Sequence, residues 1–267
     1  MNTIGISVIA GRAHVTLLAE DILYIVISGR KTVIHAAGDR IYETYTPIGE
    51  LAQALGSSFI RVDRGCLVSA KAIHAVTKTI DLINGEALDF AHRRKREITE
   101  RLRAERQRIV QTLERGSAPA TREDYRRHYA AFDQMPFAFA DIEMVFSEKN
   151  SAVDWIFRYG NPALAKLEKL PLEDLIDSSF GSLFSNMDAK WLRLYERATL
   201  YGERLEVMDH SPEIDVWLKV ICFPTFPGHC GCILFDLSDL AYTRISGQSS
   251  QAMLRYFGRT QGGDSVL

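Results

Sequence analysis

Two apolar runs that each lead into basic residues decide the fold of this chain: ILYIVISGRK at residues 22–31 and FIRVDRGCLV at residues 59–68. Both runs are short and rich in β-branched and aromatic side chains, as buried β-strands are. Each continues directly into a loop that carries arginine or lysine. A rigid strand that ends in a cationic loop presents positive charge to solvent, and this arrangement suits a polyanionic partner.

Shorter strand signals surround these two runs. Residues 4–18 contain two strands around a glycine turn, residues 32–45 predict a hairpin closed near Gly38, and residues 46–56 carry the capping signals of one short helix. Asn84-Gly85 predicts a further hairpin with a type I′ turn, in which both central residues have positive φ. This part of the chain is therefore expected to be mainly antiparallel β.

From Arg93 onward the pattern changes to helix, with Ile98, Leu102, Ile109 and Leu113 repeating at near-helical spacing. Two interpretations account for this apolar stripe. The helix either pairs with its counterpart in a homodimer or docks on its own domain. Two heptads are too few to indicate a coiled coil, so both interpretations stay open.

The remainder of the chain mixes helices and strands after an expected linker at residues 117–121. Two strands, several helices and then three antiparallel strands are an α+β order. We expect a β-rich domain at 1–97, a connecting helix and linker at 98–122, an α+β domain at 123–240 and a tail at 241–267.

The composition is that of a soluble globular protein: 267 residues, 46% hydrophobic and 25% charged. This length allows two domains that each bury a core. The N-terminus lacks a secretory pattern and no run of about 18 apolar residues occurs, so we expect a cytoplasmic protein. The four cysteines, Cys66, Cys222, Cys230 and Cys232, are then expected to be free buried thiols.

The net charge of −2 conceals an asymmetry between the two halves. Up to Arg127 there are 20 basic and 15 acidic residues, and from His128 onward there are 12 basic and 19 acidic ones. The basic excess is sharpest in residues 93–127, which carry 12 basic and 6 acidic side chains. A polyanionic partner is therefore expected at the N-terminal half.

The order of the N-terminal pieces resembles the LytTR family of bacterial DNA-binding domains. The resemblance covers roughly residues 17–98 and rests on DILYIVISGRKTVIH, the capped helix, FIRVDRGCLVS, IHAV and the basic exit HRRKRE. It implies an elongated β sandwich with one short helix, which places loops in successive major grooves of double-stranded DNA. The implied function is transcription regulation, and paired binding sites in this family imply a homodimer.

The family's contact positions can be carried over one at a time. The loop after ILYI corresponds to Arg30 and Lys31, and the loop after FIRV to Asp63 and Arg64. The sequence departs from the family where Asp63 replaces the usual His, and at Ser69, where Asn is common. An acidic loop residue repels phosphate unless Arg61 or Arg64 pairs with it. The implied DNA-binding set is Arg30, Lys31, Arg61, Arg64, Arg93 and Arg94, and the alternative is that these are solvated surface charges.

Residues 125–239 resemble a PAS sensory domain. The resemblance rests on FDQMPFAFADIEMVF, FRYGNPALAKLEKLPLEDLI and CGCILFDLSD. It implies a five-stranded antiparallel sheet that cups helices around a cavity for a small-molecule ligand, with signal sensing or dimerisation as its role. The candidate cavity residues are Phe139, Phe157, Tyr159, Leu164, Phe184 and Trp191, and the alternative is that they are ordinary core side chains.

Signals for a cofactor or for catalysis are weak. The flavin-adduct motif of light-sensing PAS domains is absent, and His210 or His229 is more simply a loop residue than a haem ligand. No phosphate loop, nucleophile elbow or zinc spacing occurs, so we expect a regulator without enzymatic activity and leave the cofactor unassigned. The rival hypothesis is a protein-interaction adaptor that does not bind specific DNA.

Overall fold

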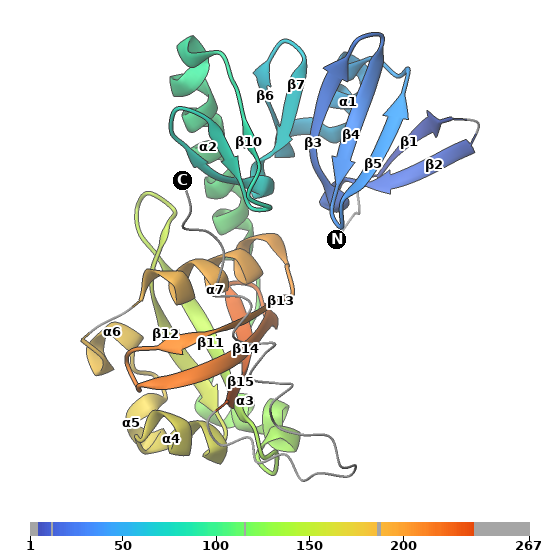
Figure 1. Ribbon diagram of the computed structural model, residues 1–267. Helices are drawn as coiled ribbons and strands as arrows, with labels where there is room; N and C mark the ends of the chain where they lie inside the picture. Colours follow the sequence, from blue (N-terminus) through green and yellow to red (C-terminus); the bar gives the residue numbers. More distant parts are fainter. Residues whose placement is uncertain (1–4, 12, 115, 186–187, 238–267) are drawn as a thin grey trace, which may run out of the picture.

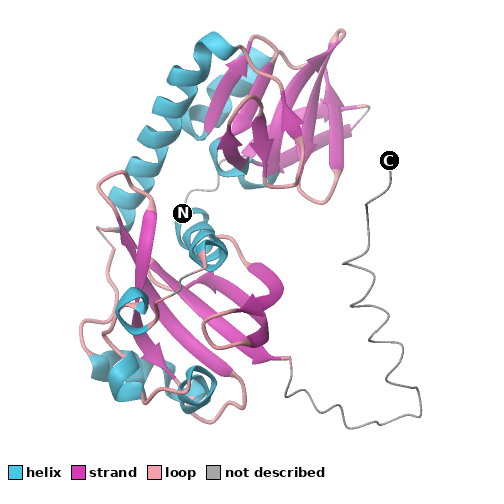
Figure 2. Cartoon of the chain, turned by 60° about the vertical axis from the view of Figure 1, so that its left-hand side comes forward, coloured by secondary structure: helices cyan, strands magenta, loops and turns pink. Residues whose placement is uncertain are grey.

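The computed structural model describes residues 5–11, 13–114, 116–185 and 188–237. In this part of the chain an N-terminal β-rich half and a C-terminal α+β half are joined by one long helix (Figure 1). The predicted tail at 241–267 lies outside the described residues. Figure 2 shows the same division, with the long helix running from one half to the other.

The N-terminal half is built on a five-stranded antiparallel sheet. Its strands, in spatial order, are β5 (Arg40–Thr44), β4 (Lys31–Ala36), β3 (Ile22–Ser28), β7 (Cys66–Ser69) and β6 (Phe59–Asp63). The two apolar runs therefore supply β3 and β6, with β7 between them. Because side chains alternate across a strand, Ile25 and Leu67 face one side of this sheet, and Tyr24 and Val68 face the other.

Each face of this sheet is covered by a different set of elements. Helix α1 (Ile48–Leu55) and the hairpin of β1 (Gly5–Ala10) and β2 (Ala13–Leu18) pack on the Ile25 side. A three-stranded sheet of β8 (Ile73–Val76), β9 (Ile80–Leu82) and β10 (Ala87–Leu88) packs on the other side. The predicted β sandwich with one short helix is present.

The β9–β10 hairpin differs from the predicted type I′ turn. Gly85 has a φ of 86°, but Asn84 is absent from the described residues with positive φ. The Gly85 amide donates to the Leu82 carbonyl, and the Leu82 amide donates to the Glu86 carbonyl. This is a three-residue loop with a left-handed glycine at its end, a form in which only Gly85 needs positive φ.

The connecting helix α2 (Lys95–Leu113) uses the first part of its apolar stripe within its own half. Ile98 is fully buried in the core formed by β6, β7 and β8, and Leu102 packs against the same core. Further along, Val110 is buried, whereas Ile109 and Leu113 are only partly buried. Of the two interpretations, docking on its own domain accounts for the first half of the stripe.

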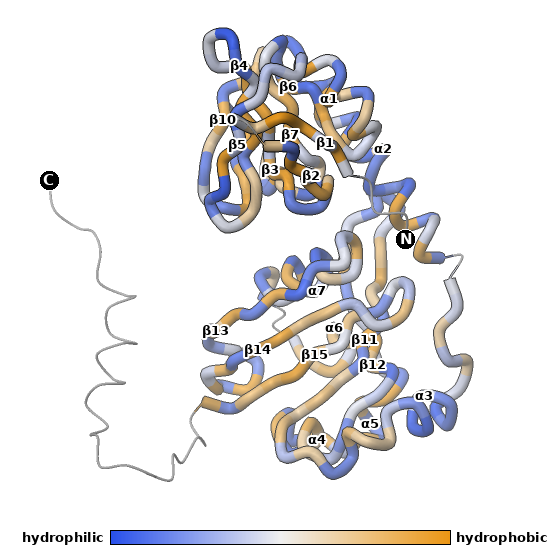
Figure 3. The backbone as a smooth tube through the Cα atoms, turned by 90° about the vertical axis from the view of Figure 1, so that its right-hand side faces the viewer, coloured by the Kyte–Doolittle hydropathy of each residue, from blue (hydrophilic) through white to orange (hydrophobic). Residues whose placement is uncertain are grey.

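The C-terminal half contains a second five-stranded antiparallel sheet. Its spatial order is β12 (Ala152–Gly160), β11 (Ala138–Phe146), β15 (His229–Asp236), β14 (Val216–Pro224) and β13 (Leu205–Ser211). Hydrophobic residues follow β14 and β15 in Figure 3, whereas helix α3 (Arg122–Tyr129) is mostly hydrophilic. The chain thus folds as the predicted α+β order.

Helices cover both faces of this sheet. Helices α4 (Pro162–Glu168), α5 (Leu172–Leu175), α6 (Phe180–Leu183) and α7 (Ala189–Tyr201) pack on one face, where the main core lies. On the opposite face lies α3, where Tyr125 and Tyr129 cover Phe139 and Tyr159. Asn161 caps α4 through Leu164 and also accepts from the Phe139 amide, so one buried side chain joins α4 to β11.

A buried polar cluster fixes α3 to the sheet. The Asp141 carboxylate is fully buried, and it accepts hydrogen bonds from Tyr129 Oη at 2.7 Å and Thr225 Oγ1 at 2.6 Å. His229 Nδ1 lies 2.7 Å from the other carboxylate oxygen. Because each oxygen has a partner, the desolvation cost of this carboxylate is offset.

The two halves contact each other through α7. Arg197 donates to the Lys71 carbonyl at 3.1 Å and holds Glu203 with two hydrogen bonds. One residue earlier, Glu196 lies 3.5 Å from Arg106 on α2. Helix α7 therefore connects the C-terminal core to the N-terminal half.

All four cysteines are buried and free, as the sequence predicts. None of the helices in the described ranges combines the length and apolar character needed to cross a membrane.

Candidate nucleic-acid interface

Two basic loops meet at one end of the N-terminal sheet. The turn at Gly29-Arg30 follows β3, and the loop at Arg64-Gly65 precedes β7, which is antiparallel to β3 and adjacent to it. The Ile27 amide donates to the Gly65 carbonyl at 2.9 Å, so the loop backbone is tied to the end of β3. Because the two loops lie at the same end of these neighbouring strands, their arginines extend from one end of the sheet.

The first loop carries one free and one paired cation. Arg30 is exposed and has no carboxylate partner among the described residues. Lys31 Nζ lies 2.5 Å from a carboxylate oxygen of Glu43 on β5, and this hydrogen bond raises the pKa of the ammonium group. The tight turn requires Gly29, whose φ is 61°.

The second loop is organised by its own backbone. Asp63 accepts a hydrogen bond from the Arg64 amide at 2.7 Å, and Arg61 Nη2 donates to the Arg64 carbonyl at 2.6 Å. The Nη2 hydrogen bond makes Arg61 a support for the loop, and its Nε atom is buried without a partner in the described part of the chain. The side chain of Arg64 is exposed and makes no ion pair in the described part of the chain.

The beginning of α2 supplies the third basic element. Arg93 is exposed, with no carboxylate partner in the described ranges, whereas Arg94 forms two hydrogen bonds to Glu97. The pKa of the Arg94 guanidinium is raised first by Glu97 and also by the charge of Asp63. The start of α2 and the β6–β7 loop therefore lie within electrostatic reach of each other, and both lie with the β3–β4 turn at the top of Figure 1.

Two further basic residues, Lys78 and Lys95, join this end and were not predicted from the sequence. Lys95 Nζ donates to the Thr77 carbonyl at 2.8 Å, which ties the β8–β9 turn to the start of α2. Lys78, the next residue of that turn, is exposed. Its position in a short polar turn was the available signal, but the family positions did not point to it.

The six predicted residues thus divide into two groups. Arg30, Arg64 and Arg93 extend guanidinium groups without carboxylate partners among the described residues. Lys31, Arg61 and Arg94 are each held by a carboxylate or a carbonyl oxygen. Guanidinium groups suit phosphate oxygens and the acceptor edge of guanine, so the first group is available to a polyanion.

The C-terminal half contains a separate cavity between its sheet and α4, α6 and α7. Of the predicted cavity residues, Phe157, Leu164 and Trp191 line it. Phe184 is outside the lining and stacks on Phe180, with ring centroids 4.6 Å apart.

The prediction that Phe139 and Tyr159 face this cavity is wrong. Both lie on the opposite face of the sheet, under α3, in the cluster with Tyr129. On β11, Ala140 and Ile142 face the cavity instead of Phe139, because side chains alternate along a strand. On β12, Phe157 and Tyr159 are two positions apart but lie on opposite faces, because the pairing with β11 shifts between Asp141 and Ile142 and leaves Arg158 as an extra residue. The sequence alone indicated neither the register of β11 nor this bulge.

A metal centre has no support in the described ranges. They contain no group of three or more His, Cys, Asp or Glu side chains placed to hold an ion. His229 is buried beside Asp141, and His210 lies 3.0 Å from Asp215, so each histidine has a carboxylate neighbour.

Comparison with known proteins covers the N-terminal half. Residues 13–103 match the family described as the LytTr DNA-binding domain, which confirms the resemblance in that region. A solved LytTr DNA-binding domain of a putative methyl-accepting/DNA response regulator from Bacillus cereus is similar at 16% identity and a TM-score of 0.34, over 38% of this chain and 98% of that one. No curated protein matches the chain.

Proposed function

We propose, from the LytTR-type DNA-binding domain at residues 13–103, that the chain is a transcription regulator that binds double-stranded DNA through the basic loops of its N-terminal half. In this proposal Arg30, Arg64 and Arg93 make the principal contacts. Lys31, Arg61 and Arg94 shape the loops that carry them, and Lys31 and Arg94 add charge near the phosphates.

One observation carries this proposal: three arginines without carboxylate partners in the described residues extend from elements that meet at one end of the domain. A phosphate oxygen can replace water on each guanidinium without first breaking an ion pair. At the opposite end of the same sheet, Arg40 instead lies 3.4 Å from Asp21 and donates to the Ala37 carbonyl. The charge distribution therefore favours one end for a polyanion.

The test is a fluorescence anisotropy titration of the full chain with a mixed-sequence DNA duplex. Arg64→Ala and Arg93→Ala are each expected to weaken binding roughly tenfold, because each loses a hydrogen bond to a charged group worth about 1.5 kcal/mol. Arg40→Ala is the matched control, since it removes the same charge from the other end of the sheet. Equal losses in all three variants would contradict the proposed interface.

We also propose a PAS-like sensory role for the C-terminal half. Numbered within this half, the strand order β12-β11-β15-β14-β13 is 2-1-5-4-3, with the helices between the second and third strands. The cavity supports a ligand, and α7 supports a route to the DNA-binding half, because it lines the cavity with Trp191 and contacts Lys71 through Arg197. The variant Arg197→Ala is expected to uncouple ligand binding from DNA affinity.

We propose a homodimer as the functional form, because two linked copies would engage paired DNA sites with higher effective concentration. On the C-terminal sheet, Met208 of β13 is 51% exposed and Trp217 of β14 is 48% exposed. This pair supplies apolar surface for self-association. Light scattering of the wild type and of Trp217→Glu tests this, with a monomeric mass expected for the variant only.

A further inference from the structure

The cavity of the C-terminal half has an unusual combination of walls. Its aromatic side chains come from three elements, β12, α6 and α7, and are Trp155, Phe157, Phe180, Trp191 and Tyr195. Its acidic side chains are Glu168 from the end of α4 and Glu213 from the β13–β14 loop, and no described lysine, arginine or histidine lines it. The lining therefore carries two carboxyl groups without a balancing cation.

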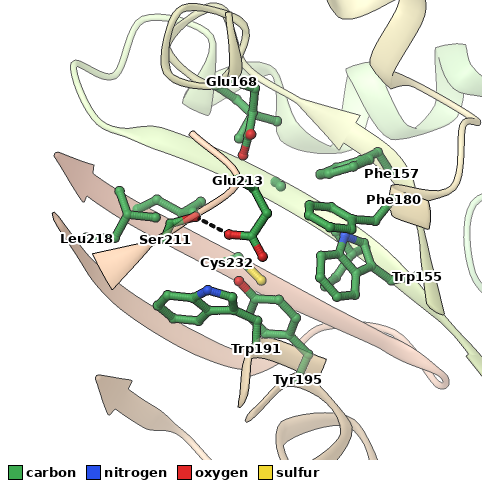
Figure 4. A pocket seen from close by; sticks show the side chains of 14 residues that line it. Trp155, Phe157, Glu168, Phe180, Trp191, Tyr195, Ser211, Glu213, Leu218 and Cys232 are labelled. Carbon is green, nitrogen blue, oxygen red and sulfur yellow. Dashed lines mark hydrogen bonds between the residues drawn. The ribbon is translucent and has the colours of Figure 1, made fainter. Parts of the chain in front are cut away.

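The two carboxyl groups differ in their partners. Both oxygens of Glu213 accept hydrogen bonds, one from Ser211 Oγ at 2.6 Å and one from the Asp188 amide at 2.9 Å. Glu168 forms no hydrogen bond or ion pair with any described residue. Figure 4 shows the Glu168 carboxyl pointing into the cavity toward Glu213. A cation placed between them would interact with both.

An indole group provides an independent sign of a ligand site. Trp191 is only 4% exposed, and its Nε1 atom is buried without a hydrogen-bond partner among the residues that the structure describes. In Figure 4 this nitrogen is on the ring edge turned toward the side of the cavity where Ser211 and Glu213 lie. A buried donor without an acceptor carries a desolvation penalty, so an oxygen atom of a ligand would be favourable there.

We propose that this cavity binds a small alkylammonium ion that also carries an oxygen acceptor, an inference that rests on the proposed sensory role of this half. The ammonium group lies between Glu168 and Glu213 and against the aromatic rings, and the oxygen accepts from Trp191 Nε1. Aromatic faces attract cations through their quadrupole, and aromatic cages recognise quaternary ammonium groups in this way. The cavity volume of about 40 Å³ exceeds the roughly 10–15 Å³ that one water needs, and the cavity is partly open to solvent, so a compact ligand can place one end inside and extend outward.

The protonation of Glu168 gives the site a pH dependence. Burial and the nearby charge of Glu213 raise the pKa of Glu168 to about 7. The other titratable groups facing it are Tyr195 and Cys232, whose pKa values burial raises, so both stay neutral at pH 6–8. Lys190 lies 5.3 Å from the ring of Trp191 but is held by Asp188 and Asp209, outside the lining.

A bound cation favours the ionised form of Glu168, and a proton competes with the cation for this carboxylate. The affinity for a permanently charged ligand should therefore rise between pH 6 and pH 8 and level off above that range. A ligand without charge should show no such rise.

The experiment is isothermal titration of the full chain, without DNA, with choline and with its neutral isostere 3,3-dimethylbutan-1-ol. Choline is expected to bind at least about tenfold more tightly at pH 8. Glu168→Gln should reduce this preference, because only Glu213 and the rings then attract the cation, and it should remove the pH dependence, while Glu173→Gln, which changes an exposed acid on α5, should keep both. Equal binding of the two probes, unchanged binding in Glu168→Gln, or no heat with choline up to about 10 mM would overturn the proposal.

A second variant separates the oxygen contact from the charge. Trp191→Phe keeps an aromatic wall but removes the indole donor, so it should weaken choline several-fold and leave tetramethylammonium, which has no oxygen, unchanged. A parallel loss for both ions would contradict the oxygen contact. Because DNA is absent, failure of these titrations leaves the DNA-binding proposal intact, and a failed DNA titration leaves this site intact.

Discussion

Replacing Glu168 by glutamine is expected to stabilise the C-terminal half at neutral pH and to have little effect near pH 4. In the folded chain, burial and Glu213 raise the pKa of Glu168 from 4.5 to about 7. The folded state therefore keeps a proton between these values that the unfolded state has released. The contribution of Glu168 protonation to the unfolding free energy is present in full below pH 4.5 and is lost as the pH rises through 7.

The magnitude follows from the size of this shift. One pKa unit corresponds to about 1.4 kcal/mol, so the difference in unfolding free energy between Glu168→Gln and the wild type should grow by about 3 kcal/mol from pH 4.5 to pH 8. Glutamine has no titrating group and nearly the same shape, so it avoids the unfavourable ionisation. Glu173→Gln is the control, because Glu173 is exposed on α5.

Urea unfolding followed by tryptophan fluorescence measures the unfolding free energy of the C-terminal half. The chain has three tryptophans, Trp155, Trp191 and Trp217, and all lie in the C-terminal half. A difference in unfolding free energy that stays constant between pH 5 and pH 8 would refute the assignment of a partly buried, proton-binding Glu168.

Three other substitutions test the remaining features. Asp63→Asn keeps the acceptor for the Arg64 amide but removes a negative charge, so DNA affinity should increase roughly threefold to tenfold in the anisotropy titration. Glu43→Gln should strengthen DNA binding by a smaller factor by releasing Lys31, and a decrease would show that the pair is needed for loop shape. Asp141→Asn should lower the unfolding free energy by about 1–3 kcal/mol in urea titrations, because it disrupts a buried hydrogen-bonded carboxylate; an unchanged midpoint would contradict the role of Asp141 in holding α3.

The N-terminal fold was predictable because its signals are local and agree with one another. The apolar runs of β3 and β6 end in polar turns, and the helix α1 has apolar residues on one face only. The family resemblance, together with the basic loops after these strands, pointed to the arginines. It could not separate Arg93 from Arg94, because that depends on Glu97 lying one helical turn further along α2.

The C-terminal cavity was less predictable because strand register sets which residues face it. A shift of one residue along β11 exchanges Phe139 for Ala140, and no local signal fixes that choice. The acidic side chains were missed for a similar reason. Glu168 and Glu213 are 45 positions apart in the sequence, and only the tertiary fold brings α4 and the β13–β14 loop to one cavity.

The most direct test of the DNA-binding proposal is the salt dependence of duplex binding by the triple variant Arg30→Ala, Arg64→Ala, Arg93→Ala. Each phosphate contact contributes about 0.9 to the slope of log affinity against log salt concentration. We expect the slope to flatten by about 2 to 3 relative to the wild type, and Arg40→Ala to leave it unchanged. An unaltered slope in the triple variant would show that this end of the sheet does not face DNA.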